Sequence, residues 1–197
     1  MELSLDLNKS YTYADYLTWA DDKMRELLNG AIRLMSPAPK LKHAVLLRKI
    51  GVPMANYVEK HKGNCQVFFA PFDVRLPKKP QEKADNQIYT VVQPDICVVC
   101  DNSKLDERGC IGAPDMVVEI LSLSSQKYDL NIKFNIYEAA GVKEYWVVSP
   151  EGKGGINVFI LQEDGKYDEG AVYEGNVDVP VKTLEGLSLN TEKLFRD

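Results

Sequence analysis

The spacing of hydrophobic residues in the N-terminal third of the chain predicts two helices. Residues 11–28 repeat apolar side chains at a spacing of roughly 3.6 residues, which is typical of an amphipathic helix. The Asn29-Gly30 dipeptide is expected to end this helix or to turn the chain into a short strand. A second helix is expected at about 41–61, with a kink or a break at Pro53, because proline lacks the N–H that a helix interior needs.

Apolar runs of strand length follow in the middle of the chain. They are rich in β-branched and aromatic residues, and they lie at 65–76, 88–100 and 113–122. The polar segment 77–86 is expected to be a loop between the first two runs. Because three strands follow one another without a helix, at least one neighbouring pair is expected to be antiparallel.

A third helix is predicted at about 126–140, with Ser124 and Ser125 as candidate N-caps and Gly141 after its last turn. A fourth strand is expected at 143–148. Helices that bracket a set of apolar strands indicate an α/β or α+β fold, with a central mixed sheet flanked by helices.

The last part of the chain alternates short apolar runs with glycine turns, which predicts a β-hairpin or meander laid against the core. A length of 197 residues is enough for one buried core. We therefore expect a single domain over 1–197, with its core at about 10–150 and a C-terminal β extension at about 151–197.

The net charge of −5 argues against general nucleic-acid binding, which depends on neutralising phosphates, but it leaves room for a local basic groove. No stretch approaches the roughly 20 apolar residues that a membrane-spanning helix needs. The N-terminus lacks the basic and apolar regions of a signal peptide. A cytoplasmic protein without membrane contact is expected.

The four cysteines allow a disulfide or a zinc site. Cys97 and Cys100 have the spacing of a metal knuckle, but residues three apart on a strand point to opposite faces. No second pair of that spacing follows, and neither histidine is near in sequence. We expect all four, Cys65, Cys97, Cys100 and Cys110, to be buried, reduced thiols.

Asp95 and Glu119 are the most informative acids, because each interrupts an otherwise apolar strand. A buried carboxylate without a partner costs several kcal/mol, so each calls for a cation or a hydrogen-bond donor. Two acids from adjacent strands that meet at one point suit Mg²⁺ or Mn²⁺. The alternative is that each forms a salt bridge with a lysine or arginine at a sheet edge.

The helix predicted at 126–140 carries Asp129, Lys133 and Tyr137 four residues apart, on roughly one face. In the simpler interpretation, Asp129 and Lys133 form a surface ion pair and Tyr137 belongs to the core. In the functional interpretation, Lys133 points over the sheet toward the carboxylates, where it orients water or stabilises charge developing on a phosphate.

His43 and Asp73 are further candidates. His43 lies in the first turn of the helix at 41–61, where the positive end of the helix dipole favours a neutral imidazole with a lone pair free for a metal, a substrate or a proton. Asp73 is another acid within an apolar run, with Arg75 as an alternative salt-bridge partner. The motifs of serine hydrolases, phosphate-binding loops, dinucleotide-binding proteins and zinc proteases are absent from the sequence.

Several of these segments together resemble a bacterial family of putative restriction endonucleases within the PD-(D/E)XK nuclease superfamily. The resemblance covers about residues 10–150, and its most specific part runs from Pro114 to Pro150. The other segments are RELLNGAIRLMSP, His43, APFDVRL and QPDICVVC. It implies a restriction-endonuclease-like fold and a Mg²⁺- or Mn²⁺-dependent endonuclease acting on DNA, in which Asp95 and Glu119 hold the metal.

The chain departs from that pattern at two positions. The usual lysine of the superfamily falls at Leu121, and the resemblance implies that Lys133 replaces it. Family members usually carry an acid directly after the turn, where this chain has Ala31; Glu26, one helical turn earlier in the predicted helix, could compensate in part.

The resemblance also implies supporting roles and partners. His43, Asp73 and Glu26 would lie in or beside the site, with Asp129 and Tyr137 behind Lys133. DNA contacts are expected at Lys40, Lys42, Arg48 and Lys49, with the 78–83 loop as a further candidate, and a homodimer is compatible with such folds. Two alternatives remain: a catalytically silent binding module that keeps the nuclease fold, which Ala31 favours, and a metal-dependent hydrolase of a small phosphorylated substrate, which the acidic composition favours.

Overall fold

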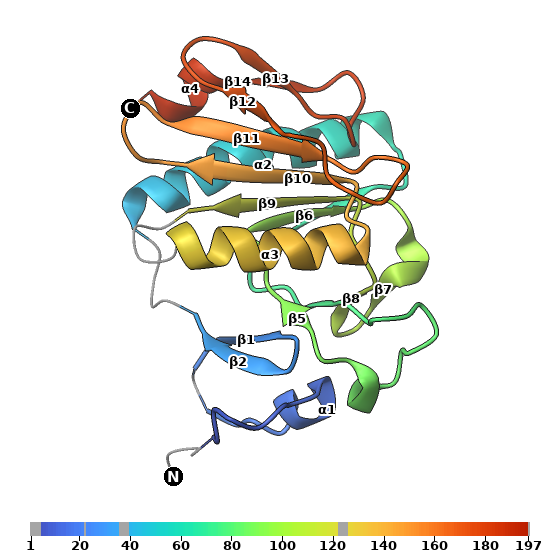
Figure 1. Ribbon diagram of the computed structural model, residues 1–197. Coiled ribbons are helices and arrows are strands. Elements are labelled where there is room, and N and C mark those ends of the chain that lie inside the picture. Colours follow the sequence, from blue (N-terminus) through green and yellow to red (C-terminus); the bar gives the residue numbers. More distant parts are fainter. Residues whose placement is uncertain (1–4, 22, 36–39, 122–125, 197) are drawn as a thin grey trace.

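The computed structural model describes residues 5–21, 23–35, 40–121 and 126–196, without the side chains of 126–130. In this part of the chain two six-stranded sheets, a small two-stranded sheet and two long helices account for the mixed α+β architecture (Figure 1). The predicted fold class is confirmed.

The central sheet has the strand order β12-β11-β10-β9-β6-β3. Its strands are β3 (Gln66–Phe69), β6 (Ile96–Val99), β9 (Met116–Ile120), β10 (Glu144–Ser149), β11 (Gly155–Ile160) and β12 (Ala171–Tyr173). β9 and β10 are parallel, and the other neighbouring pairs are antiparallel, so the sheet is mixed as expected. Because β9 and β10 are parallel, their C-terminal ends lie at the same edge.

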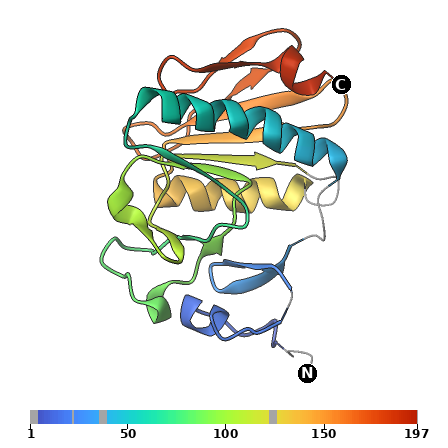
Figure 2. The ribbon, with the colours of Figure 1, turned by 180° about the vertical axis from the view of Figure 1, so that it is seen from behind.

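The two long helices cover opposite faces of this sheet, as Figures 1 and 2 show from its two sides. α2 (Leu41–His61) buries Ile50 and Met54 against Val118 and neighbouring residues of the sheet. α3 (Gln126–Ala140) buries Tyr137 on the other face, against a cluster that includes Val117. Both helices have the predicted bounds, and α2 continues through Pro53 as one helix, so the alternative of a break there is wrong.

The second sheet has the order β2-β1-β5-β4-β8-β7. Its strands are short: β1 (Arg25–Leu28), β2 (Ala31–Leu34), β4 (Val74–Arg75), β5 (Val91–Val92), β7 (Leu105–Asp106) and β8 (Gly109–Ile111). Val74 and Val92 of this sheet share a buried cluster with Cys97 and Tyr137, so the second sheet packs beneath the α3 side of the central sheet.

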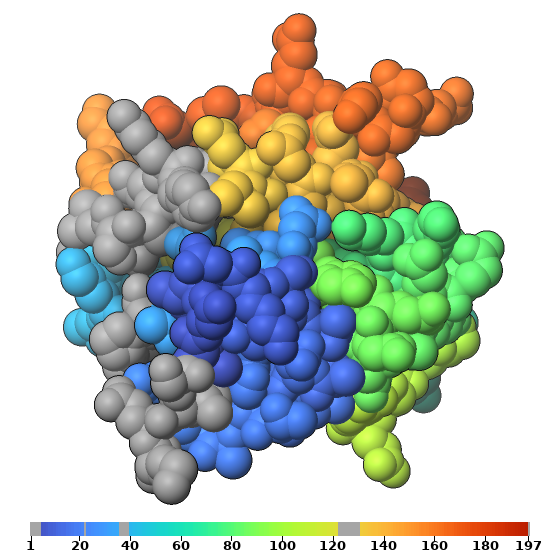
Figure 3. Space-filling model, turned by 60° about the horizontal axis from the view of Figure 1, so that its bottom comes forward, coloured from blue at the N-terminus to red at the C-terminus, as the bar shows by residue number. Residues whose placement is uncertain are grey.

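The prediction of one helix over 11–28 is wrong. Only α1 (Tyr13–Tyr16) is helical there, begun by a capping box between Thr12 and Asp15, and the chain then forms the β1–β2 hairpin. Asn29 and Gly30 make its turn with φ of 53° and 86°, the backbone that Asn-Gly hairpin turns require. The backbone N–H of Gly30 donates a hydrogen bond to the carbonyl of Tyr89. Figure 3 shows the N-terminal residues (blue) beside the green central segment, beneath α3 (yellow).

The run at 65–76 is two strands rather than one. β3 belongs to the central sheet and β4 to the second, and the chain passes between them through a cis Ala70-Pro71 peptide bond. The polar segment 77–86 is a loop that ends in the short 3₁₀ helix η1 (Asp85–Gln87), and a second one, η2 (Asn102–Lys104), precedes β7.

Part of the C-terminal segment belongs to the central sheet and is not a separate hairpin laid against the core. β11 and β12 continue the central sheet, and only β13 (Asp178–Pro180) and β14 (Ser188–Asn190) form a separate small sheet. A short helix, α4 (Thr191–Phe195), follows and packs near α2. None of the helices formed by the described residues is long and apolar enough to cross a membrane.

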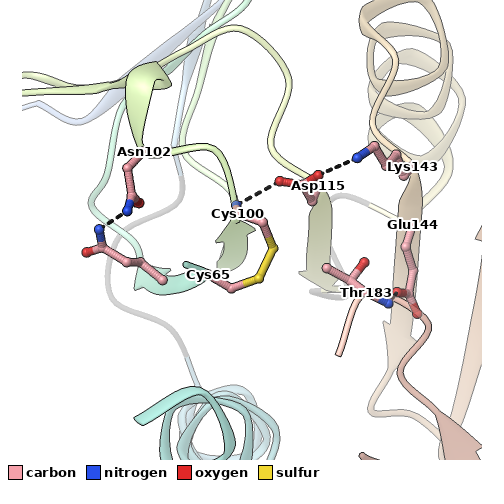
Figure 4. Close-up of a disulfide and its surroundings, with 8 residues drawn as sticks. Cys65, Cys100, Asn102, Asp115, Lys143, Glu144 and Thr183 are labelled. Atoms are coloured by element: carbon pink, nitrogen blue, oxygen red, sulfur yellow. Dashed lines mark hydrogen bonds and ion pairs between the residues drawn. A yellow bond between two sulfur atoms is a disulfide. The ribbon is translucent and has the colours of Figure 1, made fainter. Parts of the chain in front are cut away.

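The expectation of four reduced thiols is wrong for one pair. Cys65 and Cys100 form a disulfide between the ends of β3 and β6, as Figure 4 shows. The register explains the pairing, because Gln66 lies opposite Val99 and the cysteines are the next residues outward on each strand. Cys97 and Cys110 are free and buried, as expected. The candidate N-caps Ser124 and Ser125 lie outside the described residues.

Candidate active site

Asp95 lies directly before β6, at the edge of the central sheet where β9 ends. Its Oδ2 accepts a hydrogen bond of 2.7 Å from the backbone N–H of Ile120, the last residue of β9. Its Oδ1 lies 3.1 Å from Nε2 of His43 in the first turn of α2. The side chain is 18% exposed. Asp95 therefore joins the ends of two strands to the start of the helix that covers them.

Glu119 lies one residue before Ile120 and faces α3. Its Oε1 accepts hydrogen bonds from Lys133 Nζ at 2.9 Å and from the Tyr137 hydroxyl at 2.6 Å. Burial raises the pKa of Glu119 to about 7; the Lys133 ammonium opposes this shift, and the negative charge of Asp95 adds to it. Two hydrogen bonds from α3 thus hold Oε1, and Oε2 takes no part in these two bonds.

Lys133 connects Glu119 to a second buried acid, Glu26. Its Nζ lies 2.8 Å from Glu26 Oε1, a residue 107 positions earlier in the chain. Burial alone would lower the pKa of Lys133, but the two carboxylates together raise it well above its ordinary value, so the amine stays protonated. Glu26 is 2% exposed and lies on strand β1, not on a helix as predicted.

Gln93 extends this network, and the sequence analysis missed it. Its backbone N–H donates to Glu26 Oε1 at 2.9 Å, and its Nε2 donates to Asp73 Oδ1 at 2.8 Å. Asp73 Oδ2 also accepts from the Tyr13 hydroxyl, while Arg75 pairs with Asp106 rather than with Asp73. The signal that could have found Gln93 is its position: it is a polar residue directly before Pro94-Asp95 in an apolar run.

The contact with Asp95 works against the neutral state expected for His43. The pKa of His43 is raised, mainly by the hydrogen bond to Asp95, although partial burial opposes the shift. The carboxylate beside the ring outweighs the helix dipole, because its negative charge lies only 3.1 Å away. The Asp95–His43 contact is therefore a charge-assisted pair whenever the ring is protonated.

The remaining residues named in the sequence analysis lie at different places in the structure. Leu121, at the usual lysine position, is buried in the core on the α3 side of the sheet, and Ala31 is exposed at the start of β2. The side chain of Asp129 lies outside the described residues, so its pairing with Lys133 is not tested. Lys40, Lys42 and Arg48 are exposed on the first half of α2, while Lys49 is half-buried.

The charges in the site bear on whether a metal fits. Three carboxylates, Glu26, Asp95 and Glu119, face one ammonium, Lys133, and one imidazole, His43. Within the described ranges, no group of three or more His, Cys, Asp or Glu side chains is arranged to hold a metal ion. Mg²⁺ commonly binds through only one or two carboxylates and keeps several waters. The oxygen donors of Asp95 and Glu119 therefore fit a divalent cation.

Comparisons with known proteins give a family and a fold for this chain. The family model described as "Uma2: Putative restriction endonuclease" matches residues 13–192. An uncharacterized protein of Synechocystis sp. is 23% identical over 184 residues, which cover 92% of this chain and 90% of that protein. The crystal structure of a putative nuclease belonging to DUF820 from Anabaena variabilis superposes with a TM-score of 0.72 at 22% identity, covering 94% of this chain and 97% of that one. The structural likeness supports the fold.

Proposed function

Because this chain belongs to the Uma2 family of putative restriction endonucleases, we propose that it is a Mg²⁺- or Mn²⁺-dependent endonuclease that hydrolyses phosphodiester bonds of DNA. The observation that carries the proposal is the contact between Glu119 and Lys133, from two different elements, beside Asp95 at one edge of the sheet. A carboxylate pair with an adjacent fixed cation is what hydrolysis of a phosphodiester calls for.

Asp95 and Glu119 would hold the cation. A divalent cation at such a site polarises the phosphate and lowers the pKa of a bound water. Tyr137 fixes Glu119 through its hydroxyl, and His43 with the backbone of Ile120 fixes Asp95. These donors keep both carboxylates in place before a metal arrives, so less of the binding free energy is lost to ordering them.

Lys133 replaces the superfamily lysine in this proposal. Because Glu26 and Glu119 hold it protonated, it acts as a hydrogen-bond donor and a positive charge, not as a base. It orients the attacking water or stabilises the charge that develops on the phosphate oxygens. Glu26 positions Lys133, and Gln93 connects Glu26 to Asp73. Glu26, Gln93 and Asp73 therefore act on the reaction only through Lys133. Asp129 is proposed as a further supporting residue of the site.

The wider assignments belong to the same proposal. We treat 1–197 as one functional domain, since β11 and β12 continue the central sheet. Lys40, Lys42, Arg48 and Lys49 are the proposed DNA contacts, and cleavage of both strands would call for a homodimer. A cytoplasmic location is also proposed, although the Cys65–Cys100 disulfide bears against it, because disulfides are rare in that compartment.

Cleavage of supercoiled plasmid tests the activity. We expect nicking by the wild type with Mg²⁺ or Mn²⁺, a loss of about a hundredfold or more in Glu119→Gln, and partial activity in Lys133→Arg, which keeps the positive charge. Asp115→Asn is the matched control, since Asp115 lies just before β9 but pairs with Lys143, outside the carboxylate cluster. Wild-type protein that binds DNA but leaves it intact under all these conditions would contradict the endonuclease.

A second candidate is a catalytically silent nuclease-fold binding module. One observation favours it: the Lys133 amine lies between Glu26 and Glu119, so part of their charge is balanced without a metal. Intact plasmid together with DNA binding that is unaffected by Glu119→Gln would support this alternative.

A further inference from the structure

A basic pocket lies on the side of α2, outside the carboxylate cluster. It has a volume of about 520 Å³ and is formed by three segments: the first half of α2, the turn after β10, and residues 194–196. Five of its lining residues are positively charged: Lys42, Arg48, Lys49, Lys153 and Arg196. No aspartate or glutamate is among the described residues that line it.

Specific contacts hold the three segments together. Lys49 Nζ donates to the backbone carbonyls of Leu194 at 3.1 Å and of Arg196, which fastens the C-terminal residues to α2. Gly154 in the turn has a φ of 76°, and a Cβ there would lie 2.3 Å from the Phe195 ring. The turn and α4 therefore approach each other as closely as glycine allows, and the pocket walls are in place without a ligand.

The charge of this pocket is opposite to that of the whole chain. Four of its cations are exposed, in a protein whose net charge is −5. The first turn of α2 contains no acid and its N-cap, Lys40, makes no side-chain capping bond, so the positive end of the helix adds to the field. Like charges gathered around a cavity repel one another unless an anion binds between them.

The pocket and the candidate active site share one edge of the central sheet. Glu119 is next to last in β9, and Pro150 follows the end of β10, which runs parallel to β9. His43, bonded to Asp95, is the neighbour of Lys42 on α2. Figure 1 shows the start of α2, the tip of β10 and the C-terminus together at this edge. On the other side of the turn, a neighbouring cavity shares Lys153 with this pocket but also includes Glu151 and Glu174, so the surface is mixed in charge there.

We infer that this basic pocket binds backbone phosphates of a DNA strand, beside the bond presented to Asp95 and Glu119. The position relative to the cleaved bond rests on the proposed function; the binding of phosphate by the pocket does not. The pocket adds Lys153 and Arg196, from the turn and the C-terminal segment, to the contacts predicted on α2. Lysine and arginine side chains around an apolar floor suit phosphodiesters, whose charge they neutralise without reading the bases.

Fluorescence anisotropy with a short labelled DNA duplex tests this inference. Binding is measured in the presence of a chelator, so that cleavage plays no part, for the wild type and for Arg48→Gln/Lys153→Gln over a range of salt concentrations. The control is Lys60→Gln/Lys62→Gln, which removes two exposed charges at the opposite end of the same helix. Circular dichroism confirms that each variant is folded.

We expect the pocket variant to bind about tenfold more weakly at low salt, with the slope of log affinity against log salt reduced by about two, and the control to match the wild type. Equal weakening by both variants, no weakening by either, or no DNA binding by the wild type would overturn the inference. If the wild type binds as expected but does not cleave plasmid, the proposed endonuclease activity fails while the pocket assignment stands.

Discussion

Nζ of Lys133 on α3 lies 2.9 Å from Oε1 of Glu119 on β9, and the same ammonium lies 2.8 Å from Oε1 of Glu26 on β1. All three side chains are largely buried. One positive charge therefore holds two carboxylates from two different sheets. Removal of one member from such a buried group costs more than the group itself contributes, because the remaining charges lose their partner.

Lys133→Met is expected to lower the free energy of unfolding by about 3–5 kcal/mol, because Glu26 and Glu119 would stay buried without a counter-charge. The measurement is urea denaturation followed by circular dichroism. Lys143→Met is the control: its amine pairs with Asp115 but is 73% exposed, so a loss of about 0–1 kcal/mol is expected. Equal losses in the two variants would show that the Lys133 group is not a buried network.

The raised pKa of Glu119 gives stability a defined dependence on pH. The folded protein holds this proton up to a pKa of about 7, whereas the unfolded chain releases it near 4.5. The folded state therefore binds more protons between these values, and stability falls as the pH rises through this range. Glu119→Gln keeps the shape of the side chain and removes the titration.

We therefore expect the unfolding free energy of the wild type, relative to Glu119→Gln, to fall between about pH 4.5 and pH 7 and to level off above that. Lys133 stays protonated throughout this range, so it does not account for the difference. Parallel stability curves for the two proteins across this range would show that Glu119 has an ordinary pKa.

The sequence predicted the elements whose signals are long and local. The helices 41–61 and 126–140 repeat their apolar spacing over several turns, and the structure has both with those bounds. The prediction of a helix at 11–28 was wrong because the apolar spacing there is also helical. The Asn29-Gly30 turn and the pairing of Leu27 with Ile32 and Val91 instead make the end of this segment a strand. Tertiary contacts outweigh a weak local preference there.

The site was predictable only where a polar residue interrupts an apolar run. Asp95 and Glu119 have that signal. The contact of Glu26 with Lys133 spans 107 residues, and the pKa of His43 depends on an acid 52 residues away, so neither could be read from local sequence. The Cys65–Cys100 pair depends in the same way on the register of β3 against β6.

Titration of thiols tests that disulfide directly. In denaturant without reductant, we expect two reactive thiols per chain, Cys97 and Cys110, and four after reduction. Cys65→Ser/Cys100→Ser should give two under both conditions. Reduction should also lower the free energy of unfolding by about 2–4 kcal/mol, because the linked residues enclose a loop of the unfolded chain. Four reactive thiols before reduction would mean that the bond does not form.

Calorimetric titration with Mn²⁺ tests the carboxylate site most directly. We predict saturable binding to one site in the wild type, loss of that binding in Asp95→Asn/Glu119→Gln, and its retention in Asp115→Asn, whose carboxylate pairs with Lys143. No saturable binding at millimolar Mn²⁺ in folded wild-type protein, or equal binding by the Asp95→Asn/Glu119→Gln variant, would contradict a metal held by these two acids.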